Sequence, residues 1–158
     1  MAKLNDLFDY QPLPKVVGGL YSSVPVADKD CLLGVEVELE HAKYHQCPST
    51  WSREPDGSLK LDGMEFVSKP TPLGILDVEL KRLFGGLEGV TTSTRCSIHV
   101  HMNIRDLEEE ELHKLIMLYC IFERSLFRMS GDRWKSNYCV PLTTTPETVT
   151  RFLKDPYK

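Results

Sequence analysis

The stretch that decides the fold is Gly34-Val35-Glu36-Val37-Glu38-Leu39-Glu40, in which apolar and acidic residues alternate without a break. A period of two residues is typical of a β-strand with one buried face, so the three glutamates share one face. Carboxylates in one row repel one another unless a cation or a basic group neutralises them. The row therefore favours a cation-binding wall over a solvated face, and Glu40, being last, is the glutamate most expected to be merely exposed.

A second alternating stretch is Ser97-Ile98-His99-Val100-His101-Met102-Asn103-Ile104. Its polar members, which include His99, His101 and Asn103, share one face of a predicted strand. Imidazoles at every second residue complement a carboxylate row as metal ligands. An HxH pattern is a weak signal alone, and hydrogen-bonded structural histidines are the alternative. Together, the two rows predict the inner wall of a metal-binding active site.

Composition bounds the class of protein. The chain has 158 residues, 41% hydrophobic and 27% charged, which is typical of one globular domain with a substantial core. A net charge of −4, without a basic run, argues against binding to nucleic acid or to an anionic membrane. The start of the chain lacks an apolar signal core. Five widely spaced cysteines suit reduced thiols, so a cytoplasmic location is expected.

The strands are placed by alternation and turn signals. Prolines and glycines without periodicity predict that residues 1–31 form an extended arm. Strands are expected, in chain order, at 32–40, 58–61, 63–68 and 96–104.

Helical spacing predicts three helices. The first starts at Thr71-Pro72, which offers an N-cap and a proline at the first helical position. The second starts near Asp106 with a capping-box-like pattern and runs to about Ser130, and its apolar stripe predicts core packing. The third opens at Thr145-Pro146-Glu147. This order predicts an α+β fold, with an antiparallel or mixed sheet covered by helices on one face.

Two further groups of residues are candidates for the site. Glu65 lies in an otherwise apolar strand segment, which favours a further metal ligand over a surface residue on an edge strand. Basic and amide residues, among them Arg128, Arg133 and Asn137, follow the long helix. They suit a grip on phosphate or on a substrate carboxylate. A polar loop at the helix exit explains them equally well.

In their order along the chain, these motifs resemble the amidoligase family, carboxylate–amine ligases of the glutamine synthetase and glutamate–cysteine ligase superfamily. The resemblance covers roughly residues 32–142. Its motifs are Gly34–Glu38, Asp56-Gly57-Ser58, Glu65–Ser68 followed by Pro70, Ser97–Asn103, and Arg133 to Asn137–Pro141. It implies a glutamine-synthetase-like catalytic domain over residues 32–158, with an antiparallel sheet that holds metals and ATP. That domain is expected to be incomplete at its C-terminus, because nothing after Pro141 matches the family's later strand with Glu and Arg.

The resemblance also implies a reaction. ATP, with Mg²⁺ or Mn²⁺, would phosphorylate a substrate carboxylate, and an amine would displace phosphate to leave an amide. The substrates would be small molecules, peptides or protein side chains. The implied metal ligands are Glu36, Glu38, Glu65 and His99. The implied catalytic residues are Glu36, Glu38, His99 and Arg133, and the implied nucleotide or phosphate contacts are His101, Asn103 and Asn137.

Two other functions compete with a ligase. One is an inactive structural or binding protein that keeps the sheet without the activity, which the missing Glu/Arg strand favours. The other, weaker, is a metal-dependent hydrolase or cupin-like enzyme with one transition-metal site. If the chain is a ligase, an oligomer or a second chain is expected to complete the site.

Overall fold

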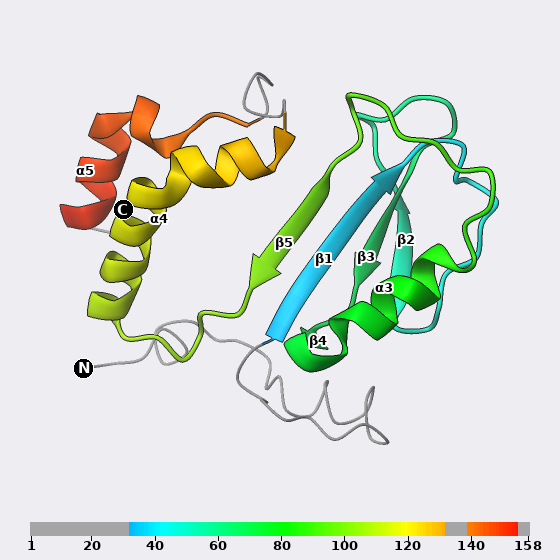
Figure 1. Cartoon of the computed structure of the whole chain (residues 1–158), viewed down its shortest axis with the longest axis horizontal. Helices are drawn as coiled ribbons and strands as arrows, with labels where there is room; N and C mark the ends of the chain where they lie inside the picture. Colours follow the sequence, from blue (N-terminus) through cyan, green and yellow to red (C-terminus); the bar gives the residue numbers. More distant parts are fainter. Residues whose placement is uncertain (1–31, 132–138, 155–158) are drawn as a thin grey trace. The chain divides into compact units, whose positions relative to one another are not determined.

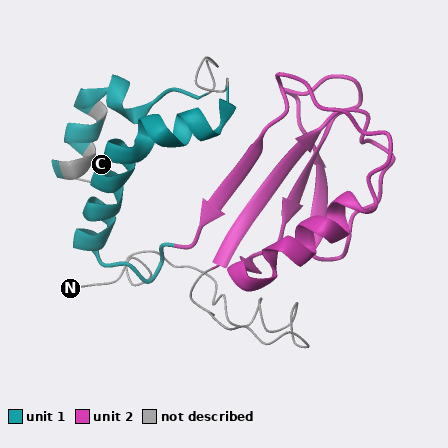
Figure 2. Cartoon of the chain, viewed as in Figure 1, with its two compact units in different colours: residues 1–8, 104–158 teal, residues 9–103 magenta. Residues whose placement is uncertain are grey.

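The computed structural model describes residues 32–131 and 139–154. They divide into two compact units, one ending at Asn103 and the other starting at Ile104 (Figure 2). The predicted N-terminal arm, together with Arg133 and Asn137, lies outside the described residues.

The first unit is built on an antiparallel sheet (Figure 1). Its central strand β1 (Leu32–Leu39) pairs with β3 (Met64–Ser68) on one side and with β5 (Ile98–Met102) on the other. Outside β3 lies β2 (Trp51–Pro55), while the short β4 (Thr71–Pro72) pairs with the start of β1. Every pairing is antiparallel, so the predicted α+β class and the strands at the two alternating stretches are confirmed.

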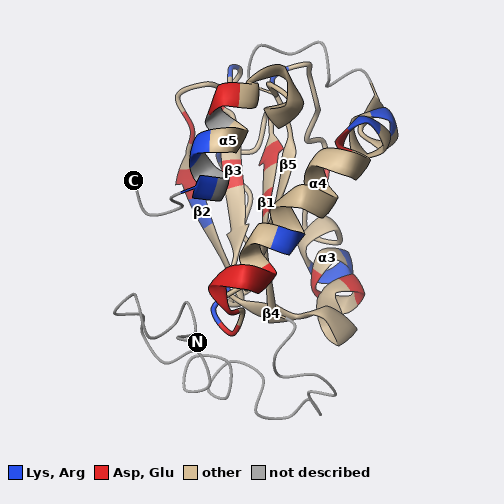
Figure 3. Ribbon diagram, turned by 90° about the vertical axis from the view of Figure 1, so that its left-hand side faces the viewer, with Lys and Arg blue, Asp and Glu red and all other residues tan. Residues whose placement is uncertain are grey.

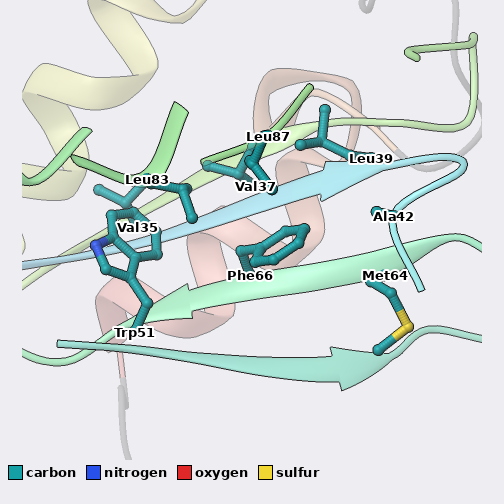
Figure 4. Packing of buried hydrophobic residues seen from close by; sticks show 9 residues of the cluster. All are labelled: Val35, Val37, Leu39, Ala42, Trp51, Met64, Phe66, Leu83 and Leu87. Atoms are coloured by element: carbon teal, nitrogen blue, oxygen red, sulfur yellow. The ribbon is translucent and has the colours of Figure 1, made fainter. Parts of the chain in front are cut away.

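The hydrophobic core lies on the apolar face of this sheet (Figure 4). A short 3₁₀ turn η1 (Leu73–Ile75) leads into α3 (Leu76–Phe84), whose Leu83 is fully buried against the sheet. The buried cluster comprises Val35, Val37, Leu39, Ala42, Trp51, Met64, Phe66, Leu83 and Leu87. Because alternate residues of β1 and β3 enter this core, the residues between them are directed to the opposite face.

The helix predicted to follow Thr71-Pro72 is present as η1 and α3, but its predicted start and one predicted strand are wrong. Thr71 and Pro72 form strand β4, buried next to β1, so Thr71 does not cap a helix; η1 begins only at Leu73 and α3 at Leu76. No strand forms at 58–61, because an Asx turn at Asp56 and a left-handed Leu61 (φ 52°) turn the chain there. The strand that pairs with β3 is β2 instead. The charged residues of β2 are exposed, as is common in an edge strand. Because they interrupt the apolar pattern, the sequence does not mark this segment as a strand.

The second unit is helical. It contains α4 (Glu109–Met129), η3 (Leu142–Thr144) and α5 (Pro146–Lys154). A capping box between Glu108 and Glu111 starts α4, so the predicted helix is confirmed with its start two residues later than Asp106. The prediction that its apolar stripe packs in a core is wrong, since Glu123 is the helix's buried residue. Hydrophobic spacing marks an apolar face but does not specify what covers it.

Two smaller expectations concern the environment of the chain. The described cysteines (Cys47, Cys96, Cys120 and Cys139) are all free, as expected. Among the described residues, no helix has both the length and the apolar composition needed to cross a bilayer.

Candidate metal site on the polar sheet face

Strand register gathers the acidic and imidazole side chains on the face opposite the core. On that face Glu36 of β1 lies opposite His99 of β5, and Glu38 lies opposite Glu65 of β3. Acidic positions accordingly gather on β1 and β3 (Figure 3). The prediction that these four residues share one pocket wall is therefore consistent with the pairing.

Glu36 is the residue on which both histidines converge. Its carboxylate accepts a hydrogen bond from His99 Nδ1 at 2.8 Å and lies 2.9 Å from His101 Nε2. The hydrogen bond from His99 lowers the pKa of Glu36 below its usual value, and His101 acts in the same direction. Glu36 therefore stays ionised when the solution is acidified mildly, as a metal ligand must.

Glu38 lies deeper, with 6% of its side chain exposed. Ser97 Oγ donates a hydrogen bond to it at 2.5 Å and lies 2.9 Å from His99 Nε2. The same imidazole nitrogen is 3.8 Å from the Glu38 carboxylate. Ser97 thus links His99 to Glu38. The sequence placed Ser97 on the polar face but gave no reason to single it out.

Glu65 lies opposite a glutamate on each of its two neighbouring strands. Its register partner on one side is Glu38 and on the other is the exposed Glu54. Partial burial raises the pKa of the Glu65 carboxyl, and neighbouring carboxylates, led by Glu36 and Asp56, raise it further. The opposing effect of His99 is smaller than that of the acids, so a bound cation would supply the positive charge that favours the ionised Glu65.

Two sets of side chains can converge on a metal ion. In one, ligand atoms of Glu36, Glu65 and His99 lie within 4.8 Å of one another, and in the other those of Glu38, Asp56 and Glu65 do so. Glu65 belongs to both. Carboxylate oxygens suit Mg²⁺ and an added imidazole suits Mn²⁺, so the donor set fits the expected metals.

Asp56 is the ligand candidate that the sequence reasoning missed. It was assigned to a turn, which it does form, since Asp56 Oδ1 accepts a hydrogen bond from the Ser58 backbone N–H at 2.7 Å. The local sequence does not distinguish an aspartate that only forms a turn from one that also lies close to a carboxylate on another strand. The resemblance includes Asp56-Gly57-Ser58 but assigns Asp56 no role, and its nearness to Glu65 follows from the pairing of β2 with β3, which ends at Pro55.

The remaining predicted residues contribute less. His101 contacts Glu36 but belongs to neither metal group. Asn103 lies just beyond β5, where its backbone N–H donates a hydrogen bond to the Leu32 carbonyl at 2.9 Å. Glu40 is not exposed as expected: it is 4% exposed and accepts hydrogen bonds from Ser93 Oγ and the Lys60 backbone N–H.

Comparison of the chain with protein-family models, with curated proteins and with solved structures found no match.

The pKa values of Glu65 and Glu36, two glutamates on the polar sheet face, are shifted in opposite directions, so their replacement should change stability with opposite sign. The ionised Glu65 opposes folding, so in metal-free protein Glu65→Gln should stabilise the fold near neutral pH, by roughly 0.2–1 kcal/mol per relieved cross-strand pair. That gain should vanish as the pH falls below the carboxyl's unfolded-state pKa. Chemical denaturation at several pH values measures both effects.

Glu36→Gln is the matched variant. In the wild type, folding lowers the pKa of Glu36, so the ionised carboxylate stabilises the fold at pH values above its unfolded-state pKa. This stabilisation is lost as the pH falls through the folded-state pKa of Glu36. Glu36→Gln should therefore destabilise the fold near neutral pH. Two variants that shift stability in the same direction would contradict this electrostatic account.

Proposed function

We propose that the chain is an ATP-dependent carboxylate–amine ligase whose polar sheet face binds divalent cations. In this proposal the sheet is a glutamine-synthetase-like catalytic wall, and the reaction passes through an acyl phosphate. ATP loses its terminal phosphate to a substrate carboxylate, and an amine then displaces that phosphate to form an amide. The motifs along residues 32–142 support the choice of reaction.

One observation carries the proposal: two candidate metal groups share Glu65. A carboxylate common to two groups suits a pair of neighbouring cations, the arrangement that phosphoryl-transfer enzymes use. Such ions would neutralise the phosphate oxygens and stabilise the charge of the transferring group. A single-metal hydrolase needs no second acidic group, so this arrangement favours a nucleotide-using enzyme.

The side chains take the roles that their positions allow. The cations would be held by five side chains, namely Glu36, Glu38, Asp56, Glu65 and His99. His101 lies at the exposed end of the face, with 62% of its side chain accessible, and is assigned to the nucleotide. Asn103 is assigned to the nucleotide, Arg133 to the substrate or its phosphate, and Asn137 to the phosphate. These last three assignments rest on the resemblance alone.

A second chain or subunit would complete the site in this proposal. Among the described residues β5 pairs only with β1, so its other edge is unpaired in that part of the chain. An exposed strand edge accepts a further strand through backbone hydrogen bonds. A strand bearing Glu and Arg beside β5 would lie next to His99 and His101.

The proposal predicts that Mg²⁺ and ATP together raise the melting temperature of the wild-type protein more than either alone. At a ligand concentration 100-fold above Kd, binding stabilises a protein by about 2.7 kcal/mol. For units of this size that is on the order of 10 °C. His99→Ala should remove the shift, because it deletes a ligand of the first metal group.

The other functions give different outcomes in the same experiment. A shift with Mg²⁺ alone, unchanged by ATP, would favour a metal-binding protein without ligase activity. Tightly held zinc or iron, with no response to Mg²⁺ and ATP, would favour the single-metal hydrolase. No shift under any of these conditions would refute the proposal.

A further inference from the structure

A cleft of about 420 Å³ lies within the helical unit, and none of its lining residues belongs to the acidic sheet face. One wall is the face of α4 that carries Glu123, Arg124, Phe127 and Arg128, and the other is the segment around η3. Spacings of four residues place Arg124 and Arg128 one turn apart on a common side of the helix. The volume lies within the range of small-molecule sites.

The cleft is held in shape by a buried carboxylate. Glu123 is 1% exposed, and it accepts hydrogen bonds from the backbone N–H groups of Leu142 at 2.6 Å and Thr143 at 3.0 Å. The Thr143 hydroxyl donates to the same carboxylate at 2.5 Å. These bonds pin the segment around η3 to α4, and they lower the pKa of Glu123 despite its desolvation. Hydrogen bonds therefore hold the two walls of the cleft together.

The charged groups of the cleft that are available to a ligand are the two arginines. The Glu123 carboxylate is engaged by three donors, whereas neither Arg124 nor Arg128 forms an ion pair with any described residue. Guanidinium groups bind carboxylate and phosphate oxygens through paired hydrogen bonds. Phe127 and Pro141 add apolar surface beside them, suited to the body of an organic ligand.

We propose that this cleft binds a small organic anion whose carboxylate or phosphate group is held by Arg124 and Arg128 while its apolar part packs on Phe127 and Pro141. The inference does not rest on the proposed ligase activity, because it uses no residue of the sheet face. The two anion types share the chemistry that the arginines recognise, so the experiment distinguishes them.

Phenyl phosphate, benzoate and inorganic phosphate serve as probes. Each is titrated to millimolar concentration into the full-length protein, and amide resonances are followed by NMR. Phenyl phosphate or benzoate should shift the amide resonances of residues 123–128 and 142–144 and should bind more tightly than inorganic phosphate. The stronger of the two organic probes identifies the anion type.

Single variants assign the contacts. Arg124→Gln and Arg128→Gln should each weaken binding about tenfold, the loss expected for one charge-assisted hydrogen-bonded contact. Lys114→Gln, which removes one positive charge from the same helix outside the cleft, should bind as the wild type does. Phe127→Leu should weaken the organic probes but not inorganic phosphate.

Three outcomes would overturn the inference. These are no shift of the cleft resonances with either organic probe, equal binding of inorganic phosphate and phenyl phosphate, and equal losses in Lys114→Gln and the arginine variants. Because both arginines are exposed, their replacement leaves the fold intact, which a melting curve of each variant verifies.

Discussion

Glu36→Gln is expected to abolish the stabilisation of the protein by Mg²⁺ and ATP. Glutamine keeps the size of the side chain but removes the charge that a hard cation requires. Loss of an outer-shell partner alone costs about 10–100-fold in metal affinity, so loss of a direct ligand should exceed about 100-fold. At ligand concentrations that shift the wild type by on the order of 10 °C, the variant should shift by at most about 2 °C. Differential scanning calorimetry with and without Mg²⁺ and ATP measures this.

Glu54→Gln is the matched control. It removes a carboxylate from the same face and from the same cross-strand row as Glu65, but Glu54 belongs to neither metal group. Its Mg²⁺–ATP shift should equal that of the wild type. Equal shifts in Glu36→Gln and Glu54→Gln would mean that only the overall negative charge of the face matters, and that no defined site exists.

Phe66→Ala is expected to give the largest loss of stability in the chain. Phe66 lies on β3 and is fully buried in the hydrophobic core, and truncating a buried phenylalanine costs about 3–5 kcal/mol. That is a large fraction of the 5–15 kcal/mol that folds a typical domain. Urea denaturation followed by circular dichroism should show the midpoint falling accordingly.

Phe84→Ala tests whether the loss follows burial rather than residue type. Phe84 ends α3 and is 47% exposed, so its truncation should cost less than about 1 kcal/mol. Comparable losses at the two positions would contradict the position of the core. Phe66→Ala should also weaken metal binding, because Phe66 is the neighbour of Glu65 and holds β3 in register with β1.

The sequence was sufficient to predict two of the strands that carry the candidate site, β1 and β5. In β1 and in β5, strict alternation specifies which residues share a face, since a shift of one residue would place the valines of β1 in water. A capping-box start for α4 was also predicted from a short local pattern, but two residues too early, because the box joins Glu108 to Glu111. Each of these features depends on local sequence alone.

What the sequence did not predict depends on pairing between distant segments. Asp56 joins Glu65 only because β2 pairs with β3, and Ser97 reaches Glu38 only through the register of β5 on β1. Likewise, Thr71-Pro72 has the local sequence of a helix start, but pairing with β1 makes it a strand and moves the start of the helical segment to Leu73. Local patterns thus predicted which residues share one face of a strand. Which residues of other segments lie beside them depends on strand pairing, which the local patterns do not specify.

Counting bound Mn²⁺ by electron paramagnetic resonance tests the central claim most directly, because Glu65 belongs to both candidate metal groups. Titration of the wild-type protein should show two bound ions close enough for their signals to couple. Glu65→Gln should bind neither ion tightly, and Glu54→Gln should bind both. Retention of wild-type Mn²⁺ binding by Glu65→Gln, or no binding by the wild type, would contradict the account.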